Sequence, residues 1–131
     1  MRCLLDTHAL IWASVTPERL GAAAAKILQD RRNDLYVSLA TMWEISVKVS
    51  KPQNLLTLPR GWSERTDDYM AEWGLSWLPI RLDHCRAVRA LPWGRHRDPF
   101  DRMLIAQAQV EELSIVTADP DFKKYDIKVV W

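Results

Sequence analysis

The sequence predicts an α/β protein whose central parallel β-sheet has about five strands, with helices flanking both faces. Short apolar runs such as Cys3-Leu4-Leu5 lack polar alternation, and strands of this kind are typically buried on both faces of a parallel sheet. These runs alternate with segments of helical composition, an order that requires right-handed crossovers between parallel strands. The chain of 131 residues has no repeat, low-complexity stretch or linker. We therefore expect residues 1–131 to form a single domain.

Short apolar segments are expected to form the strands. They span residues 2–6, 35–39, 75–80, 113–116 and 127–130. Apolar, β-branched and aromatic side chains dominate them, and these side chains fit a pleated, buried surface. Because Pro79 cannot donate a ladder hydrogen bond, the third strand is expected to lie at an edge of the sheet or to end there.

The remaining segments are expected to be helices joined by loops. Helical composition covers residues 8–13, 18–31, 41–49, 61–73 and 83–91, with loops at 51–59 and 92–94. Pro17, Pro52 and Gly74 interrupt or end these segments, since proline and glycine disfavour the helix interior. Asp83 is expected to cap the fifth helix.

A last long helix is expected to begin at the run Asp98-Pro99-Phe100-Asp101. Asp98 stands at the N-cap, where a carboxylate accepts a first-turn amide, and Pro99 suits the first helical position. Asp101 falls in the first turn, where the helix dipole favours negative charge. One face is apolar at helical spacing, through Phe100, Leu104, Ile105 and Ala108. Capping and the dipole alone would explain both aspartates.

The formal net charge of +1 gives no sign of a general nucleic-acid-binding surface. Arginines nevertheless crowd the segment around Asp98 and Asp101. They are Arg81, Arg86, Arg89, Arg95, Arg97 and Arg102. Cations beside carboxylates would suit a phosphodiester that needs both a metal ion and charge neutralisation. A solvated helix face with ordinary ion pairs explains the same pattern, and both interpretations remain open.

Nothing in the sequence suggests a membrane or secreted protein. No stretch approaches the roughly 20 apolar residues that span a bilayer, and the N-terminus reaches the acid Asp6 too soon for a signal peptide. Cys3 lies in an expected strand and Cys85 in an expected helix, without paired spacing. We expect a cytoplasmic protein with no membrane partner and with buried free thiols, rather than a disulfide or zinc site.

Carboxylates stand where several elements begin or end. Asp6 and Asp119 follow expected strands, Asp101 opens the last helix, and Glu44 interrupts an apolar helix. Because sites in parallel sheets form beyond the carboxyl ends of the strands, these side chains are expected to gather at one edge. Mg²⁺ prefers oxygen ligands, and a bound metal can activate water against a phosphodiester. Their joint placement therefore predicts a metal site.

Each acid also has a purely structural explanation. Asp6 could form an Asx turn before the next helix, and Asp119 could build the turn that follows it. Glu44 lies three residues after Thr41, the spacing of a capping box, and taken alone it favours that role. Thr117 could pair in its strand or orient a carboxylate through its hydroxyl.

Four motifs spread over nearly the whole chain carry a family resemblance. They are Leu4-Leu5-Asp6-Thr7-His8, Val37-Ser38 with Trp43-Glu44-Ile45-Ser46-Val47-Lys48, the run from His96 to Ala108, and Val116-Thr117-Ala118-Asp119-Pro120-Asp121-Phe122. Together they resemble the PIN-domain family, specifically the VapC-like toxins of bacterial type II toxin–antitoxin pairs. The Asp-Pro-Phe-Asp-Arg sequence at 98–102 is the most distinctive part, whereas residues 49–54 depart from the Gly-Lys-Leu often seen after the glutamate helix.

The resemblance implies a PIN-like fold and an endoribonuclease that depends on Mg²⁺ or Mn²⁺. It implies a catalytic quartet of acids at Asp6, Glu44, Asp101 and Asp119. The metal ligands among them would be Asp6, Asp101 and Asp119. Secondary roles are expected for Thr7, Thr117 and Arg102, and for Asp98 as a helix cap or outer ligand.

The same resemblance implies an RNA substrate, a homodimer, and inhibition by the C-terminal segment of a cognate antitoxin. The seven tryptophans exceed what one core needs, and tryptophan is enriched where a surface is buried against another chain. We expect the antitoxin segment to lie in a groove between early helices, lined by Trp12 and Trp43, and to send a basic side chain toward the acids. Burial in the core explains most single tryptophans equally well.

Two other classes of function compete with the nuclease interpretation. The alternative is a non-catalytic RNA-binding or scaffold protein with the same fold, although crowded carboxylates without a metal would repel one another. Phosphoryl transfer through an aspartyl phosphate fits poorly. A receiver-like protein needs an aspartate at the middle strand end, where Val37-Ser38-Leu39 has none. A haloacid-dehalogenase-like phosphatase needs one two residues after Asp6, where His8 stands.

Overall fold

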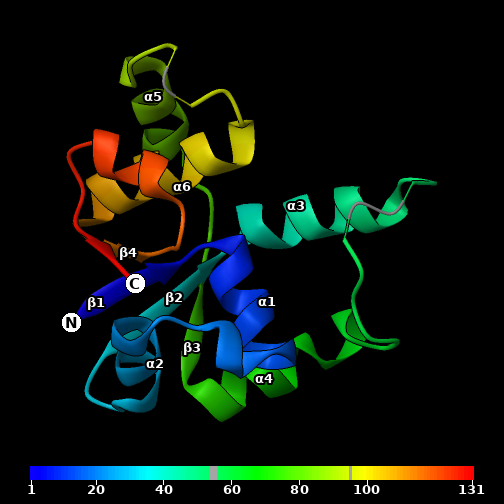
Figure 1. Cartoon of the computed structure of the whole chain (residues 1–131). Helices are drawn as coiled ribbons and strands as arrows, with labels where there is room; N and C mark the ends of the chain where they lie inside the picture. The colour runs from blue at the N-terminus through cyan, green and yellow to red at the C-terminus, as the bar shows by residue number, and fades with distance from the viewer. Residues whose placement is uncertain (54–55, 95) are drawn as a thin grey trace.

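The computed structural model contains one five-stranded sheet in which every neighbouring pair is parallel (Figure 1). It describes residues 1–53, 56–94 and 96–131. Parts of the expected loop 51–59 and of the arginine-rich segment, namely Asn54, Leu55 and Arg95, lie outside the described residues. The strands are β1 (Arg2–Leu5), β2 (Asp34–Ser38), β3 (Leu75–Leu78), β4 (Ser114–Val116) and β5 (Val129–Val130).

The strand order is β3-β2-β1-β4-β5. The chain therefore winds from β1 toward β3 on one side and from β4 to β5 on the other, which puts the reversal of direction between β1 and β4. The third strand lies at an edge, as Pro79 predicts. The predicted α/β fold class, with a parallel sheet of five strands and helices on both faces, is confirmed.

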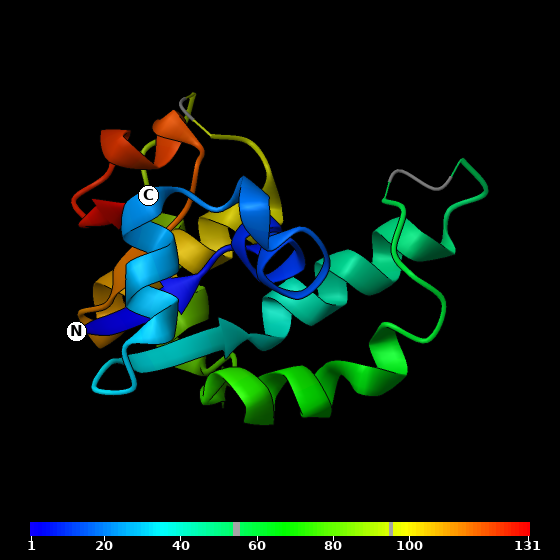
Figure 2. The ribbon, with the colours of Figure 1, turned by 60° about the horizontal axis from the view of Figure 1, so that its bottom comes forward.

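Helices fill the connections between the strands. The α-helices are α1 (Thr7–Val15), α2 (Ala22–Gln29), α3 (Leu39–Ser50), α4 (Thr66–Trp73), α5 (Leu82–Ala90) and α6 (Pro99–Glu111). Short 3-10 turns are η1 (Pro17–Arg19), η2 (Ser63–Arg65) and η3 (Pro120–Lys124). Helices α5 and α6 cover one face of the sheet, and α1, α2 and α4 lie on the other, while α3 extends outward from the end of β2 (Figures 1 and 2).

Two hydrophobic clusters separate along the two faces of the sheet. Leu5 and Val37 face the cluster that α1, α2 and α4 complete, whereas Leu4 and Ile115 face the cluster completed by α6 and η3. Successive strand side chains point to opposite faces, so the unbroken run Cys3-Leu4-Leu5 supplies both cores. This two-sided burial explains why the strands lack polar alternation.

One predicted helix is divided in two. Residues 18–31 form η1 and α2, separated at Gly21, which is the N-cap of α2. A Cβ atom at Gly21 would lie 2.7 Å from the backbone and side chain of Trp131. The close approach of the C-terminal residue therefore requires glycine here, a constraint that helical composition does not reveal. Similarly, residues 61–65 are not α-helical, and α4 begins only at Thr66.

The predicted caps of two helices are wrong. Helix α3 begins at Leu39 with Ser38 as N-cap, whose hydroxyl accepts from the Ala40 amide at 2.9 Å. The capping box of Thr41 and Glu44 is therefore not formed. Helix α5 begins at Leu82 and not at Asp83, and the Asp83 carboxylate instead forms an ion pair with Arg81 at 2.8 Å.

The two cysteines differ in exposure. Both cysteines are free, but only Cys3 is buried, and Cys85 is exposed on α5, contrary to the prediction. Its helix turns this position away from the core, which the spacing of a short helix did not show. Among the helices of the described residues, none has the length and apolar character needed to cross a bilayer.

We expect Ser38→Ala to destabilise the protein by about 1 kcal/mol, because it removes the side-chain cap of α3. Thr41→Val is the matched control. The Thr41 hydroxyl is buried with no hydrogen-bond partner among the described residues, so its removal should leave stability unchanged or raise it slightly. Urea unfolding of both variants measures the difference. A larger loss of stability for Thr41→Val than for Ser38→Ala would show that Thr41, and not Ser38, caps α3.

Candidate active site

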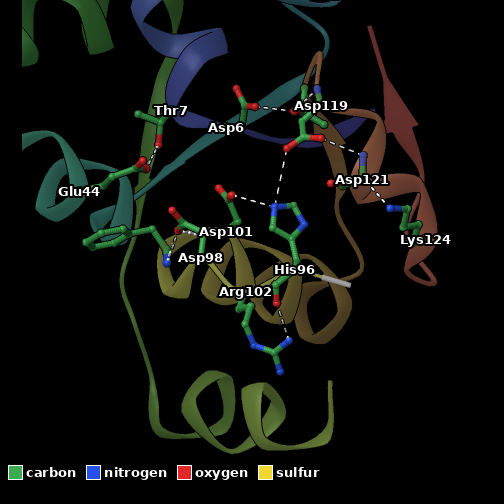
Figure 3. Close-up of polar contacts among 12 residues, drawn as sticks. Asp6, Thr7, Glu44, His96, Asp98, Asp101, Arg102, Asp119, Asp121 and Lys124 are labelled. Atoms are coloured by element: carbon green, nitrogen blue, oxygen red, sulfur yellow. Dashed lines mark hydrogen bonds and ion pairs between the residues drawn. The ribbon is translucent and has the colours of Figure 1, made fainter. Parts of the chain in front are cut away.

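Five carboxylates converge at the edge of the sheet where β1 and β4 end (Figure 3). Asp6 follows β1 and Asp119 follows β4, while Asp98 and Asp101 open α6 and Glu44 lies on α3. This edge is the point at which the strand order reverses, and in parallel α/β sheets such switch points form the usual ligand sites. The topology thus brings together residues that are more than 100 positions apart in the chain.

The tightest group within this cluster joins Asp101 and Asp119 through His96. The Nε2 atom of His96 lies 2.9 Å from Oδ2 of Asp101 and 3.7 Å from Oδ2 of Asp119. One ligand atom from each residue lies within 4.8 Å of the others. The Asp119 side chain is 39% exposed, so the group can be reached from solvent. Sequence reasoning did not assign a role to His96, which lies in a loop without periodic neighbours.

Asp6 is held just beside this group by two hydrogen bonds. Its Oδ1 accepts from the Ala9 amide at 2.6 Å and so caps α1. Its Oδ2 accepts from the hydroxyl of Thr117, whose oxygen in turn accepts from the Asp119 amide at 3.0 Å. Thr117 therefore orients a carboxylate, one of the two roles considered for it. Asp6 therefore both caps α1 and lies in the carboxylate cluster.

Glu44 is nearly buried and has partners of its own. It accepts from the Thr7 hydroxyl and forms an ion pair with Lys48 one turn later on α3. These contacts use both carboxylate oxygens, Oε2 for Thr7 and Oε1 for Lys48. Glu44 thus lies outside the group formed by His96, Asp101 and Asp119.

Asp98 acts as the N-cap that the sequence predicts. Its Oδ1 accepts from the amides of Phe100 at 2.8 Å and Asp101 at 3.1 Å. These bonds fix the first turn of α6, from which the Asp101 side chain projects toward His96 (Figure 3). Asp98 thereby positions Asp101 and adds a negative charge beside it.

Arg102 points away from the acids into the loop before α6 (Figure 3). Its buried guanidinium donates to four backbone carbonyls, those of Val88, Leu91, Pro92 and His96. Arg102 therefore holds the loop and does not neutralise a ligand at the acids. Arg81 likewise pairs with Asp83 and with Glu111 at 2.6 Å. For these two arginines, the structure supports ordinary structural pairing.

Among the described residues, the carboxylates of the cluster outnumber the basic side chains that face them, His96 and Lys48. Burial, together with the Asp98 and Glu44 carboxylates, raises the pKa of Asp101 to about 7, and His96 opposes this rise. Burial also raises the pKa of Asp6, against the hydrogen bonds from Thr117 and Ala9. Buried carboxyl groups without sufficient countercharge favour the neutral form. A divalent cation would supply the missing charge.

The donor set fits a metal ion by its chemistry. Asp101 and Asp119 offer oxygens close together, with Asp6 held beside them through Thr117. Oxygen ligands suit Mg²⁺ and Mn²⁺, and Mg²⁺ is usually held by one or two carboxylates plus waters. The burial of Asp101 beside the Asp98 and Glu44 carboxylates, which raises its pKa, agrees with such a cation.

Trp12 and Trp43 lie in two different pockets, contrary to the expected common groove. Trp12 borders the acids in a pocket of about 270 Å³ that also includes Asp6 and Asp119. Trp43 is 61% exposed and stacks edge-on against Phe100 beside a second, apolar pocket of about 310 Å³. Because α1 and α3 leave the sheet from different strand ends, their tryptophans are not brought together.

Fold and site define an α/β domain with a carboxylate cluster at its topological switch point. Comparison with known proteins identifies the family: the PIN domain model matches residues 3–128, and the chain belongs to the PIN domain family. The chain is 28% identical over 126 residues to Ribonuclease VapC22 of Mycobacterium tuberculosis, covering 88% of this chain and 85% of that protein.

Solved structures agree with this assignment. A toxin–antitoxin complex from Klebsiella pneumoniae is 26% identical with a TM-score of 0.65, covering 98% of this chain and 96% of that one. VapBC2 from Rickettsia felis, bound to a DNA fragment from its promoter, has a TM-score of 0.70 at 15% identity and covers 99% and 98% of the two chains. The latter likeness concerns the fold alone.

We expect the melting temperature of the metal-free protein to fall as the pH rises from about 4 to about 7. The pKa of Asp101 is about 7 when folded, whereas an unfolded aspartate titrates near 3.9. The folded state therefore binds the proton more tightly, and this stabilisation is lost as the pH rises through the folded pKa. Differential scanning fluorimetry at several pH values measures the slope.

Asp101→Asn is the control for this slope and should make it shallower, leaving the contribution of Asp6. Saturating Mn²⁺ should also flatten it, because a cation favours the ionised carboxylates. Identical slopes for wild type and Asp101→Asn would show that Asp101 titrates normally.

Proposed function

We propose that the chain is an endoribonuclease that depends on Mg²⁺ or Mn²⁺ and acts as the toxin of a toxin–antitoxin pair. The observation that carries the proposal is the meeting of Asp101 and Asp119 at the switch point, with Asp6 beside them. Membership of the PIN domain family supports it. The names of its relatives, a ribonuclease and a toxin–antitoxin complex, point to the same activity and biological role.

In this proposal, Asp101 and Asp119 hold the cation and Asp6 completes the ligand set. When bound, the cation would activate a water molecule and stabilise charge on the phosphodiester. The hydroxyl of Thr117 keeps Asp6 oriented, and its oxygen also holds the Asp119 backbone. Glu44 acts beside the cation and not as a direct ligand, because Thr7 and Lys48 occupy its oxygens. The ion pair with Lys48 reduces the repulsion between Glu44 and the other carboxylates.

A non-catalytic RNA-binding or scaffold role is the alternative. It requires the acids to remain crowded without a metal, although the pKa of Asp101 is already raised to about 7 by burial and by neighbouring carboxylates. Such crowding is unfavourable unless a cation relieves it. The two functions differ in one measurable respect, since only the nuclease produces new RNA ends.

We expect Asp6→Asn and Asp101→Asn to lower RNA cleavage by about 10²–10³-fold or more, the usual cost of removing an electrostatic element of a catalytic site. Asp98→Asn should lose less, because asparagine caps a helix about as well as aspartate. Cleavage of total RNA, followed by mapping of the new ends, measures these effects. A chelator should abolish cleavage, and added Mn²⁺ should restore it.

Two outcomes would contradict this arrangement. Cleavage that persists in the presence of the chelator would show that the reaction does not need a metal ion. Equal losses for Asp98→Asn and Asp101→Asn would show that Asp98 does more than cap α6. Circular dichroism of each variant provides the check that the fold is retained.

The proposed partners occupy the two tryptophan pockets. A basic side chain of an antitoxin placed in the Trp12 pocket would reach Asp6 and Asp119 and compete with the cation for them. The pocket beside Trp43 is apolar, and its neighbour Trp93 is 80% exposed. An exposed apolar patch of this kind suits contact with another chain, here a second copy in a homodimer.

We expect Trp12→Ala to weaken binding of the antitoxin by about 30-fold or more, the scale of an interface hot spot, and to leave the dimer intact. Trp43→Ala is the matched control, because it should weaken the dimer and spare the antitoxin. Co-expression with the neighbouring small gene's product, with light scattering of each complex, measures both. A monomer that does not bind this product and stays active in its presence would refute the toxin role. The proposed nuclease activity would still stand.

A further inference from the structure

His96 belongs to the tight group at the site, but its role is not explained by the acids alone. Its imidazole is only 8% exposed, and Nε2 points at Asp101 and Asp119 (Figure 3). Two roles fit that direction. Nε2 could bind the cation through its lone pair, or it could carry a proton and donate a hydrogen bond to Oδ2 of Asp101, 2.9 Å away.

The other ring nitrogen distinguishes these roles. Nδ1 of His96 is buried and has no hydrogen-bond partner among residues 1–53, 56–94 and 96–131. A proton on Nδ1 would be a buried donor without an acceptor, which is costlier and rarer than a buried acceptor without a donor. A proton on Nε2 avoids this cost, because Nε2 has the Asp101 carboxylate as its acceptor. A protonated Nε2 has no lone pair to offer a metal, and metal-binding histidines almost always donate their other N–H to a defined partner.

His84 shows the same type of contact away from the acids. It is completely buried, and its Nε2 lies 2.8 Å from Oε1 of Glu111. Its Nδ1 accepts from the Arg81 amide at 3.0 Å, which assigns the proton to Nε2. His84 thus uses a buried Nε2–H to hold a carboxylate on the far end of α6. The chain contains an internal example of the geometry inferred for His96.

The ring of His96 is itself firmly placed. Arg102 donates to its backbone carbonyl at 3.2 Å and also to the carbonyls of Leu91 and Pro92 at 3.1 and 3.0 Å. Phe122 packs edge-on against the imidazole, with ring centroids 5.2 Å apart. Asp101 and Arg102 are adjacent on α6, so the same helical turn carries the acid and holds the loop that supplies its donor.

From these contacts we propose that His96 is a positioning residue for Asp101 and is not itself a metal ligand. The Nε2–H group holds Oδ2 of Asp101, stops the carboxylate from rotating and leaves Oδ1 for the cation. This inference rests on the metal-dependent function proposed above and adds to it the residue that orients one ligand. Arg102 supports the same arrangement one step further from the acids.

The test compares Mn²⁺ affinity, by calorimetry, in wild type, His96→Gln and His96→Leu. Glutamine keeps an N–H donor, whereas leucine fills similar space without one. We expect His96→Leu to weaken Mn²⁺ binding by about 10–100-fold, the usual cost of losing a residue that orients a ligand, and His96→Gln to recover most of this loss. His84→Leu is the matched control, and should lower thermal stability with no change in Mn²⁺ affinity.

Pulsed electron paramagnetic resonance of bound Mn²⁺ separates orientation from ligation. We expect no signal from a directly coordinated imidazole nitrogen in the wild-type protein. Such a signal, if lost in His96→Leu, would overturn the inference. It would equally be overturned by unchanged affinity in His96→Leu or by absence of Mn²⁺ binding to the wild type. The expected affinities without any RNA cleavage would refute the proposed nuclease and leave the role of His96 standing.

Discussion

The need to satisfy several carboxylates at one partly buried edge of the sheet governs how this domain is built. Asp6 and Glu44 are buried and Asp101 is largely buried, so each of these three requires a donor or a countercharge from the protein. Asp6 accepts hydrogen bonds from the Ala9 amide and the Thr117 hydroxyl. Glu44 accepts from Thr7 and forms an ion pair with Lys48. Asp101 lies in hydrogen-bond contact with His96. These partners come from different elements of the chain. The acids thus connect the elements as well as forming a site.

The start of α6 shows how closely capping, packing and the site are combined. Asp98 ends the loop and caps the helix, Phe100 packs on Trp43, and Asp101 turns toward His96. Arg102 then holds the carbonyls of the loop that precedes the helix. A substitution at any of these positions would affect stability and the site together. Measurements of activity here therefore need a parallel measurement of folding.

Most elements could be predicted because their signals are local. Apolar runs showed the strands, Asp98 and Pro99 showed the start of α6, and Pro79 showed the edge strand. The predictions failed where a residue far away in the chain determines the local structure. Trp131 lies so close to Gly21, between η1 and α2, that a side chain has no room there. Ser38 caps α3 in place of the expected capping box, and Glu44 accepts from Thr7 on another helix.

By itself, the sequence determined the α/β class, the family resemblance and the identity of the acids, because apolar periodicity, caps and motifs are properties of neighbouring residues. Only the tertiary structure decided which acids meet. The parallel pairing of β1 with β4 places Asp6 near Asp119, and the loop held by Arg102 carries His96 to Asp101. Hydrogen bonds and burial between residues far apart in the chain depend on the packed fold. For that reason, the partners of each carboxylate could not be derived from spacing.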